Sequence, residues 1–282
     1  EKIKVLIVGD AMIDCYMWGI INRQSPEAPI PIVDIEKYEK KLSGAANVAS
    51  NIKALGATPI LCSVIGNEDK GFLDLMKDKK LSTKGILQEG RKTTVKTRII
   101  SENKHQLRVD EEDNFPIVNE DKFIKHATNL MNNADVIIFQ DYNKGVLTKD
   151  VIKSLIKYAK IKKIPILADP KKENYWEYKG VNIFKPNLKE LKDSISKNES
   201  LRSDSIIKIV SKQRKKLNAD CFLLTLSEKG VFIQSKNINK QIPATIRNIV
   251  DVSGAGDSVI ATAALALSLK LDYYNIGRLA NL

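Results

Sequence analysis

The sequence predicts an α/β fold: a three-layer α/β/α sandwich with a mostly parallel central sheet and a small β-sheet lid. Along the 282 residues, short apolar, β-branched runs alternate with helical patterns. Runs this apolar are typical of parallel strands that are covered by helices on both faces. No internal repeat and no long linker divides the sequence, so we expect a single domain over residues 1–282.

Hydrophobic periodicity defines the elements of the sandwich. The first strand is a β-branched run that ends at Gly9, and Gly56 closes the first helix. The expected strands are Lys4–Val8, Pro59–Ile65, Val136–Phe139, Pro165–Ala168 and Cys221–Leu226. The expected helices are Asn47–Leu55, Gly71–Lys80, Glu120–Asn132, Lys149–Lys162 and Ser203–Leu217. This order indicates parallel strands joined by helical crossovers.

Two segments, at about residues 15–40 and 92–112, break this rhythm and predict the lid. Ile30–Tyr38 has the pattern of a strand. Thr93–Ile100 and Gln106–Asp110 flank the sequence Ser-Glu-Asn-Lys, which suits a hairpin turn. We expect these strands to form a small sheet that stands off the main one. Such a lid resembles those that pair edge to edge in dimers, and this resemblance implies a homodimer.

Composition narrows the class of protein. There are 46 basic and 34 acidic residues, a net charge of +12, but the lysines lie in short runs on helical patterns and only 6% of residues are aromatic. Solvated helix faces explain this better than nucleic-acid binding, and a positive field also suits anionic substrates. No stretch approaches the ~20 apolar residues of a membrane span. Three scattered cysteines, Cys15, Cys62 and Cys221, predict reduced thiols in a cytoplasmic protein.

The densest chemical signal is the run Asp-Val-Ser-Gly-Ala-Gly-Asp at residues 251–257, followed by an apolar helical pattern through Leu269. The glycine turn, Gly254, Ala255 and Gly256, would direct backbone N–H groups to the start of that helix, where partial positive charge favours a phosphoryl group. Asp257 would then be a general base for a substrate hydroxyl. The alternative is an ordinary turn with Asp257 as a helix cap. The sequence has no Walker-type loop, no Gly-x-Gly-x-x-Gly and no His-Glu-x-x-His.

The motifs resemble the ribokinase-like (PfkB-type) carbohydrate kinases. The run at residues 251–257 is similar to that family's C-terminal signature, and Ser43–Ala49 is similar to its N-terminal signature. Asn187–Glu190 matches the family's Asn-x-x-Glu, and Thr225–Gly230 resembles its nucleotide segment. Four motifs in the family's order, spread over nearly the whole chain, are far more specific than any one of them.

A narrower resemblance is to the heptose 7-phosphate kinases. It rests on Gly9–Asp14, Ser25–Pro29, Asp141–Gly145 and Asp169–Lys171. It implies phosphorylation of the anomeric hydroxyl of D-glycero-β-D-manno-heptose 7-phosphate to the 1,7-bisphosphate, on the way to ADP-heptose and the lipopolysaccharide core. The alternatives are a kinase of the same fold for another sugar, sugar phosphate or nucleoside, and a non-catalytic nucleotide- or sugar-binding regulator.

Some kinases of this kind are fused to an adenylyltransferase domain. Its His-x-x-His-type motif does not occur in this sequence. We expect the last part of the family's nucleotide pocket to lie beyond Leu282.

The resemblance also implies roles on the sugar side. Asp14, expected at the carboxyl end of the first strand, would bind sugar hydroxyls. For Asn47 the alternative is a helix-start residue that satisfies its own backbone. Arg108, with Lys96 and Arg98 on the neighbouring strand, would bind the substrate phosphate, although such cations also suit an exposed edge strand. The residues expected to contact the sugar are Asp14, Gly44, Asn47, Asp141 and Lys144.

On the nucleotide side, the resemblance implies ATP and Mg²⁺, and it leaves a monovalent cation open. Asn187 and Glu190 would organise the metal and the ATP phosphates, chiefly through water, because Mg²⁺ keeps several of its waters. Thr225 and Gly230 would line the nucleotide pocket, and Lys171 would bind either phosphate.

Overall fold

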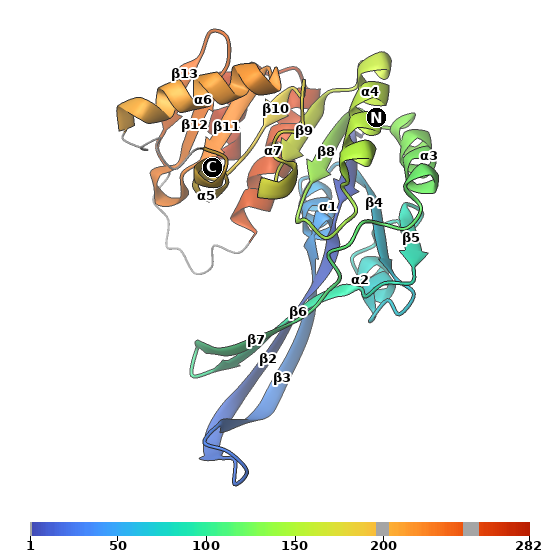
Figure 1. Ribbon diagram of the computed structural model, residues 1–282, viewed down its shortest axis with the longest axis vertical. Coiled ribbons are helices and arrows are strands. Elements are labelled where there is room, and N and C mark those ends of the chain that lie inside the picture. The colour runs from blue at the N-terminus through green and yellow to red at the C-terminus, as the bar shows by residue number, and fades with distance from the viewer. Residues whose placement is uncertain (1, 196–202, 245–253) are drawn as a thin grey trace.

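The computed structural model describes residues 2–195, 203–244 and 254–282. It is a three-layer α/β/α sandwich from which a long β arm extends (Figure 1). The predicted fold class and lid are therefore confirmed.

The middle layer is one large sheet. Within the described residues it has nine strands in the order β13-β12-β11-β10-β9-β8-β1-β4-β5. Neighbouring strands are parallel except at β11–β12 and β12–β13. The strands are β1 (Lys4–Gly9), β4 (Thr58–Gly66), β5 (Ile86–Glu89), β8 (Val136–Gln140), β9 (Ile166–Asp169), β10 (Ile183–Phe184), β11 (Cys221–Thr225), β12 (Val231–Gln234) and β13 (Asn239–Ile242).

The side chains of β1 show that both faces of the sheet are apolar and must be covered by helices. Val5 and Ile7 belong to one buried cluster, and Leu6 and Val8 belong to the other, because successive side chains of a strand point to opposite faces. Helices α1 (Ala45–Ala54), α2 (Phe72–Asp78), α7 (Ala255–Ser268) and α8 (Tyr273–Ala280) contribute to the first cluster. Helices α3 (Glu120–Met131), α4 (Lys149–Lys162), α5 (Leu188–Asp193) and α6 (Ser203–Leu217) contribute to the second.

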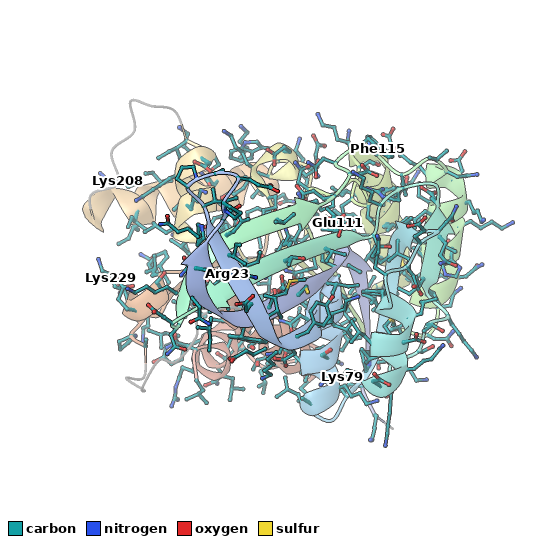
Figure 2. All side chains as sticks on the ribbon, turned by 90° about the horizontal axis from the view of Figure 1, so that it is seen from below. Arg23, Lys79, Glu111, Phe115, Lys208 and Lys229 are labelled. Carbon is teal, nitrogen blue, oxygen red and sulfur yellow. The ribbon has the colours of Figure 1, made fainter. Side chains whose placement is uncertain are left out.

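The arm is a second sheet with the strand order β3-β2-β6-β7. Its strands are β2 (Ala11–Gln24), β3 (Pro31–Gly44), β6 (Thr94–Ser101) and β7 (Lys104–Glu111). Viewed from below in Figure 2, its strands cross in front of the sandwich, with Arg23 labelled on β2 and Glu111 on β7. The predicted hairpin turn is present, with Glu102 and Asn103 in the left-handed region.

The arm differs from the expectation in length. β2 and β3 pair from Ala11 to Gly44, whereas the sequence predicts a strand only over Ile30–Tyr38 within this lid segment. Most residues in the outer parts of both strands are half-buried or exposed, on both faces, so apolar and polar residues do not alternate there as they do in a strand with one buried face. A consequence is that Asp14 lies within β2, and the residue that follows β1 is Asp10.

Several short elements of the sandwich were not predicted: β5, β10, β12, β13, α5 and α8. Strands of two to four residues, such as β10 and β12, are too short to show a period. Among the described residues, no helix combines the length and the apolar character needed to cross a membrane.

Close contact between β1 and β8 leads to a prediction about stability. A Cβ atom on Gly9 would lie 1.9 Å from the carbonyl oxygen of Gln140, whereas one on Gly90 would have nothing within 4 Å. We expect Gly9→Ala to lower the free energy of unfolding by about 1–3 kcal/mol or more, because two packed strands must separate. Gly90→Ala, the matched control, should change it by less than about 1 kcal/mol. Urea denaturation measures both, and equal midpoints for the two variants would contradict this view of the β1–β8 junction.

Candidate active site

Chemically active side chains gather where the carboxyl ends of β1, β8, β9 and β10 meet. Gly9 pairs with Gln140, and Gln140 pairs with Asp169, so these strands end side by side. Asp10 follows β1 directly, and Lys185 follows β10. In parallel sheets this edge is where ligands bind.

The predicted glycine turn leads into α7 at this edge. Gly254 is the N-cap residue, in the left-handed region with φ 81°, and α7 begins at Ala255. The first N–H groups of a helix have no partner inside it, so they and the helix dipole attract an anion. The three preceding residues of the run, Asp251, Val252 and Ser253, lie outside the described part of the chain.

Asp257 lies in the first turn of α7 and is 5% exposed. Its Oδ2 accepts a hydrogen bond from Asn47 Nδ2 at 2.7 Å. Its Oδ1 accepts bonds from Gln140 Nε2 at 3.1 Å and from the Tyr142 hydroxyl at 2.9 Å. The carboxylate therefore does not cap its own helix, and it faces donors from α1, from β8 and from the loop after β8.

Three donors leave one acceptor position on this carboxylate. Each carboxylate oxygen offers about two lone-pair sites, so Oδ1 is fully used and Oδ2 keeps one. A Cβ atom built on Gly254 would lie 4.0 Å from Oδ2, so the oxygen with the remaining site is next to the glycine turn. A hydroxyl bound between Oδ2 and the turn would meet both a base and an anion site.

The charges around Asp257 set its protonation. Burial raises the pKa of Asp257, the hydrogen bond from Asn47 lowers it, and the charge of Asp169 raises it. Lys185 Nζ is 2.9 Å from Asp169 Oδ2 and only 3% of its side chain is exposed. A Cβ atom on Gly256 would be 3.6 Å from Lys185 Nζ, so this ammonium group also faces the glycine turn.

Gln140, Tyr142, Asp169 and Lys185 were not among the predicted site residues. Gln140 Nε2 donates to both Asp257 and Asp169, at 3.1 Å each. A signal for Lys185 was available: a lysine directly before Pro186 and Asn187 follows an apolar run, and long cations rarely lie at buried strand ends without a role.

The Asn-x-x-Glu motif forms a capping box at the start of α5. Asn187 Oδ1 accepts from the backbone N–H of Glu190 at 2.8 Å, and Glu190 Oε2 accepts from that of Asn187 at 2.8 Å. Glu190 Oε1 accepts from Lys171 Nζ. Each of these oxygens keeps one further lone pair, so the motif fits a magnesium ion held through bridging waters. No cluster of three acidic, cysteine or histidine ligands occurs among the described residues.

Thr225 and Gly230 lie beside this motif. Thr225 ends β11 and forms an isolated parallel bridge with Asn187. Gly230 has φ 84°, and a Cβ atom there would lie 2.1 Å from the carbonyl oxygen of Ile242, so the turn requires glycine. The predicted nucleotide residues therefore share one end of the sheet.

The lid presents its charged side chains on one face. Across the arm, Asp14 pairs with Lys96, and Lys96 pairs with Asp110. Arg98 Nη1 donates to Asp14 Oδ1 at 2.6 Å. Arg108 bonds both carboxylate oxygens of Asp110, at 2.7 and 2.6 Å. The predicted grouping of these cations on neighbouring strands is confirmed.

Lys144 connects the lid to the sandwich. Its ammonium group is 2.8 Å from Glu112 Oε1, just after β7, and 2.9 Å from Asn114 Oδ1. Lys144 belongs to the loop after β8. The charged face of the lid is therefore tied to the same edge of the sheet as Asp257.

Two expectations about sugar contacts need correction. Asp14 is not at the end of β1 but on the lid, because the chain enters β2 at once. Asp141 does not face an open site: it is 1% exposed, and its carboxylate accepts from the backbone N–H of Asn143, from Asn174 Nδ2 and from the Tyr178 hydroxyl, at 2.8, 3.1 and 2.7 Å. Burial, together with the charge of Asp10, raises the pKa of Asp141 to about 6.

Gly44 lies at the N-cap of α1 with φ 61°. A Cβ atom there would be 2.4 Å from the carbonyl oxygen of Asp10, so this position brings α1 against the end of β1. Asn47 lies three residues later in α1 and donates to Asp257 Oδ2, so the same contact helps to position this donor.

A groove of about 870 Å³ lies between α6 and the β12–β13 turn. Gln234 lines the groove and pairs with Phe222, near the start of β11. Thr225 lies at the other end of β11. The groove therefore lies at the edge of the sheet away from the glycine turn and contains none of the predicted site residues.

The chain matches the family model for pfkB family carbohydrate kinases over residues 2–282. It is 38% identical over 282 residues to the bifunctional protein HldE of Campylobacter jejuni subsp. doylei, an alignment that covers 100% of this chain and 60% of that relative. It is 38% identical over 288 residues to HldE of Helicobacter hepaticus, covering 99% of this chain and 58% of that relative. The chain thus spans about 60% of the length of these relatives.

Solved structures resemble the fold. Phosphofructokinase-2 from Escherichia coli, in a tetrameric inhibited form, matches with a TM-score of 0.79 at 15% identity, covering 99% of this chain and 92% of that one. Ribokinase from Arabidopsis thaliana, complexed with ribose and ATP, matches with a TM-score of 0.76 at 17% identity, covering 99% and 90%. These identities show the fold alone, while the family model and the HldE relatives confirm the resemblance predicted from the motifs. The chain belongs to the pfkB family of carbohydrate kinases and is a phosphotransferase that acts on sugar hydroxyl groups.

Proposed function

We propose that the chain transfers the γ-phosphoryl group of ATP to the anomeric hydroxyl of D-glycero-β-D-manno-heptose 7-phosphate, giving the 1,7-bisphosphate of ADP-heptose synthesis. The observation that carries the kinase chemistry is the buried carboxylate of Asp257, with one acceptor position beside the glycine turn. The choice of sugar rests on the heptose kinase motifs and on the similarity to the HldE relatives along the whole chain.

In the proposed reaction, Asp257 Oδ2 takes the proton of the anomeric hydroxyl as its oxygen attacks the γ-phosphorus. The bond from that phosphorus to the bridging oxygen breaks, and ADP leaves. The backbone N–H groups at Gly254, Ala255 and Gly256 stabilise the charge on the transferring group. Lys185, which faces this turn, supports them with an ammonium group held by Asp169.

The nucleotide is proposed to lie over α5 and the end of β11. Asn187 and Glu190 would hold Mg²⁺ through water, and the ion would neutralise charge on the phosphate oxygens. Lys171, paired with Glu190, can bind a phosphate, and Thr225 with Gly230 would border the base and ribose. A monovalent cation and a cytoplasmic location remain predictions.

The sugar is proposed to lie under the charged face of the lid. Asp14 would accept from its hydroxyls, with Gly44 and Asn47 closing the wall, and Lys144 would mark its border. Arg108, with Lys96 and Arg98, would bind the 7-phosphate, since a guanidinium matches phosphate geometry.

The opposite face of the lid supports a homodimer. An apolar row crosses all four strands in register: Leu107, Ile99, Met17 and Tyr38. Leu107 is 56% exposed and Tyr38 is 53% exposed, so this row is available to a second copy.

The first test is a coupled assay of ADP release with Mg-ATP. We expect selective turnover of heptose 7-phosphate over fructose 6-phosphate, ribose and adenosine. Turnover of another acceptor would keep the chemistry and reject the proposed sugar. Binding of ATP and sugar phosphate without ADP release would favour the alternative function, a non-catalytic nucleotide- or sugar-binding regulator.

A second test addresses the base. Asp257→Asn should lower kcat by roughly 10²–10⁴-fold, because an amide cannot accept the proton. The affinity for ATP should stay within a few-fold, since the glycine turn is unchanged. Kinetics and calorimetric titration measure the two quantities. Retention of most turnover would show that Asp257 is not the base.

The third test addresses the dimer. Leu107→Glu should convert a dimer into a monomer in light scattering, because a charge would be buried in the apolar row. Ile161→Glu is the control: Ile161 is 69% exposed, but it lies on α4 and not on the lid. A dimeric Leu107→Glu variant, or a wild-type chain that stays monomeric at high concentration, would argue against pairing through the lid.

A further inference from the structure

The loop after β8 carries a tyrosine whose hydroxyl reaches the proposed base. We infer that Tyr142 is a positioning residue for Asp257, and that Asp10 acts through Tyr142 by anchoring this loop. The inference deepens the proposed function, since it rests on the role of Asp257 as the base. The Tyr142 hydroxyl donates to Asp257 Oδ1 at 2.9 Å.

Asp10 fixes the loop from the side of β1. It is 1% exposed, and its carboxylate accepts three backbone hydrogen bonds from the loop. Oδ2 accepts from the N–H groups of Tyr142 at 2.8 Å and Lys144 at 3.1 Å, and Oδ1 accepts from that of Val146 at 3.1 Å. Burial raises the pKa of Asp10 and these bonds lower it, so the loop itself stabilises the ionised form.

Arg91 holds the same loop from the other side. Its Nη2 donates to the carbonyl oxygen of Lys144 and, at 3.1 Å, to that of Asp113. Its guanidinium lies 5.2 Å from the centre of the Phe115 ring. Gly145, with φ 88°, packs so tightly that a Cβ atom would lie 1.9 Å from the Phe115 carbonyl oxygen. The backbone around Tyr142 is therefore held on both sides.

The Tyr142 hydroxyl stays protonated, so it always acts as a hydrogen-bond donor to Asp257. Burial, followed by the charges of Asp257 and Asp169, raises the pKa of Tyr142 well above its ordinary value of 10. The hydroxyl therefore keeps its proton throughout the working range and cannot act as a base itself. Lys171 Nζ lies 5.3 Å from the ring centre and restrains the ring from above.

The hydrogen bond from Tyr142 determines which carboxylate oxygen of Asp257 can still accept a hydrogen bond from the substrate. With Tyr142 and Gln140 on Oδ1, the remaining acceptor position is on Oδ2, next to the glycine turn. Without the hydroxyl, Oδ1 gains an open position away from the turn, and the ionised carboxylate loses a donor. The charged groups that also face Asp257 are Asp169 and Lys185, and the variant below leaves both unchanged.

The experiment is Tyr142→Phe, with Tyr158→Phe as the matched control. The Tyr158 hydroxyl also donates to a side chain, Asn132 Oδ1 at 2.9 Å, but this bond joins α4 to the end of α3 and involves none of the site residues. Activity needs the ionised form of Asp257, and loss of a donor to that form raises its pKa. In Tyr142→Phe we expect the acid limb of the kcat–pH profile to move up by about one pH unit, and kcat at its plateau to fall about tenfold. Tyr158→Phe should change neither.

The role inferred for Asp10 is tested with two variants: Asp10→Asn alone, and Asp10→Asn combined with Tyr142→Phe. If Asp10 acts through Tyr142, the double variant should shift the acid limb no further than Tyr142→Phe does. Additive shifts would overturn the role assigned to Asp10. An unchanged limb and an unchanged kcat in Tyr142→Phe would overturn the role of Tyr142.

A second readout does not depend on turnover. In protein carrying carboxyl-¹³C aspartate, the resonance missing from Asp257→Asn identifies Asp257, and its titration is followed in wild type and in Tyr142→Phe. An upward shift in the variant supports the hydrogen bond, and identical titrations overturn the inference. If wild type phosphorylates no sugar, the proposed function fails, while this titration still decides whether Tyr142 holds the Asp257 carboxylate.

Discussion

Burial of the Asp257 carboxylate is the constraint on which the site depends. An ionised carboxylate in a dry site costs several kcal/mol unless hydrogen bonds replace its water. Here the replacements come from three separate parts of the chain: Asn47 in α1, Gln140 at the end of β8 and Tyr142 in the following loop. The buried carboxylate is therefore stabilised in its ionised form only when α1, α7, β8 and the following loop have their native arrangement.

The same network arranges the charges on the other side of the base. Gln140 bridges the carboxylates of Asp257 and Asp169 with one amide nitrogen, which lets two acidic groups share a buried edge. Lys185 compensates Asp169 and at the same time faces the glycine turn. The Lys185 ammonium group is 3% exposed, so water screens its attraction for a phosphoryl group less than it screens that of a surface lysine, while the paired Asp169 offsets part of its charge.

The alternation of strands and helices could be predicted from the sequence, and so could the glycine run with Asp257, because each is a local pattern. Lys185 and Gln140 could not be found in that way, since their roles depend on strand order: β10 has two residues, and only pairing places its end beside β9. The expected position of Asp14, at the end of β1, and the expected exposure of Asp141 to the sugar were wrong for a related reason. Which of two adjacent residues faces a site depends on turn geometry, here Asn143 and Gly145 at positive φ, and no period reveals it.

The lid cations differ in how readily they can exchange a carboxylate for a phosphate. Arg108 is 52% exposed, so solvent screens its bonds to Asp110, and such a pair contributes only about 0–1 kcal/mol. Arg98 and Asp14 are 18% and 17% exposed and bonded at 2.6 Å, so breaking that pair costs more. A phosphate dianion would therefore compete most easily for Arg108, while Arg98 can keep its bond to Asp14 and offer its other N–H groups to the phosphate. This difference supports Arg108 as the proposed phosphate ligand, with Arg98 fixing the carboxylate that would meet the sugar hydroxyls.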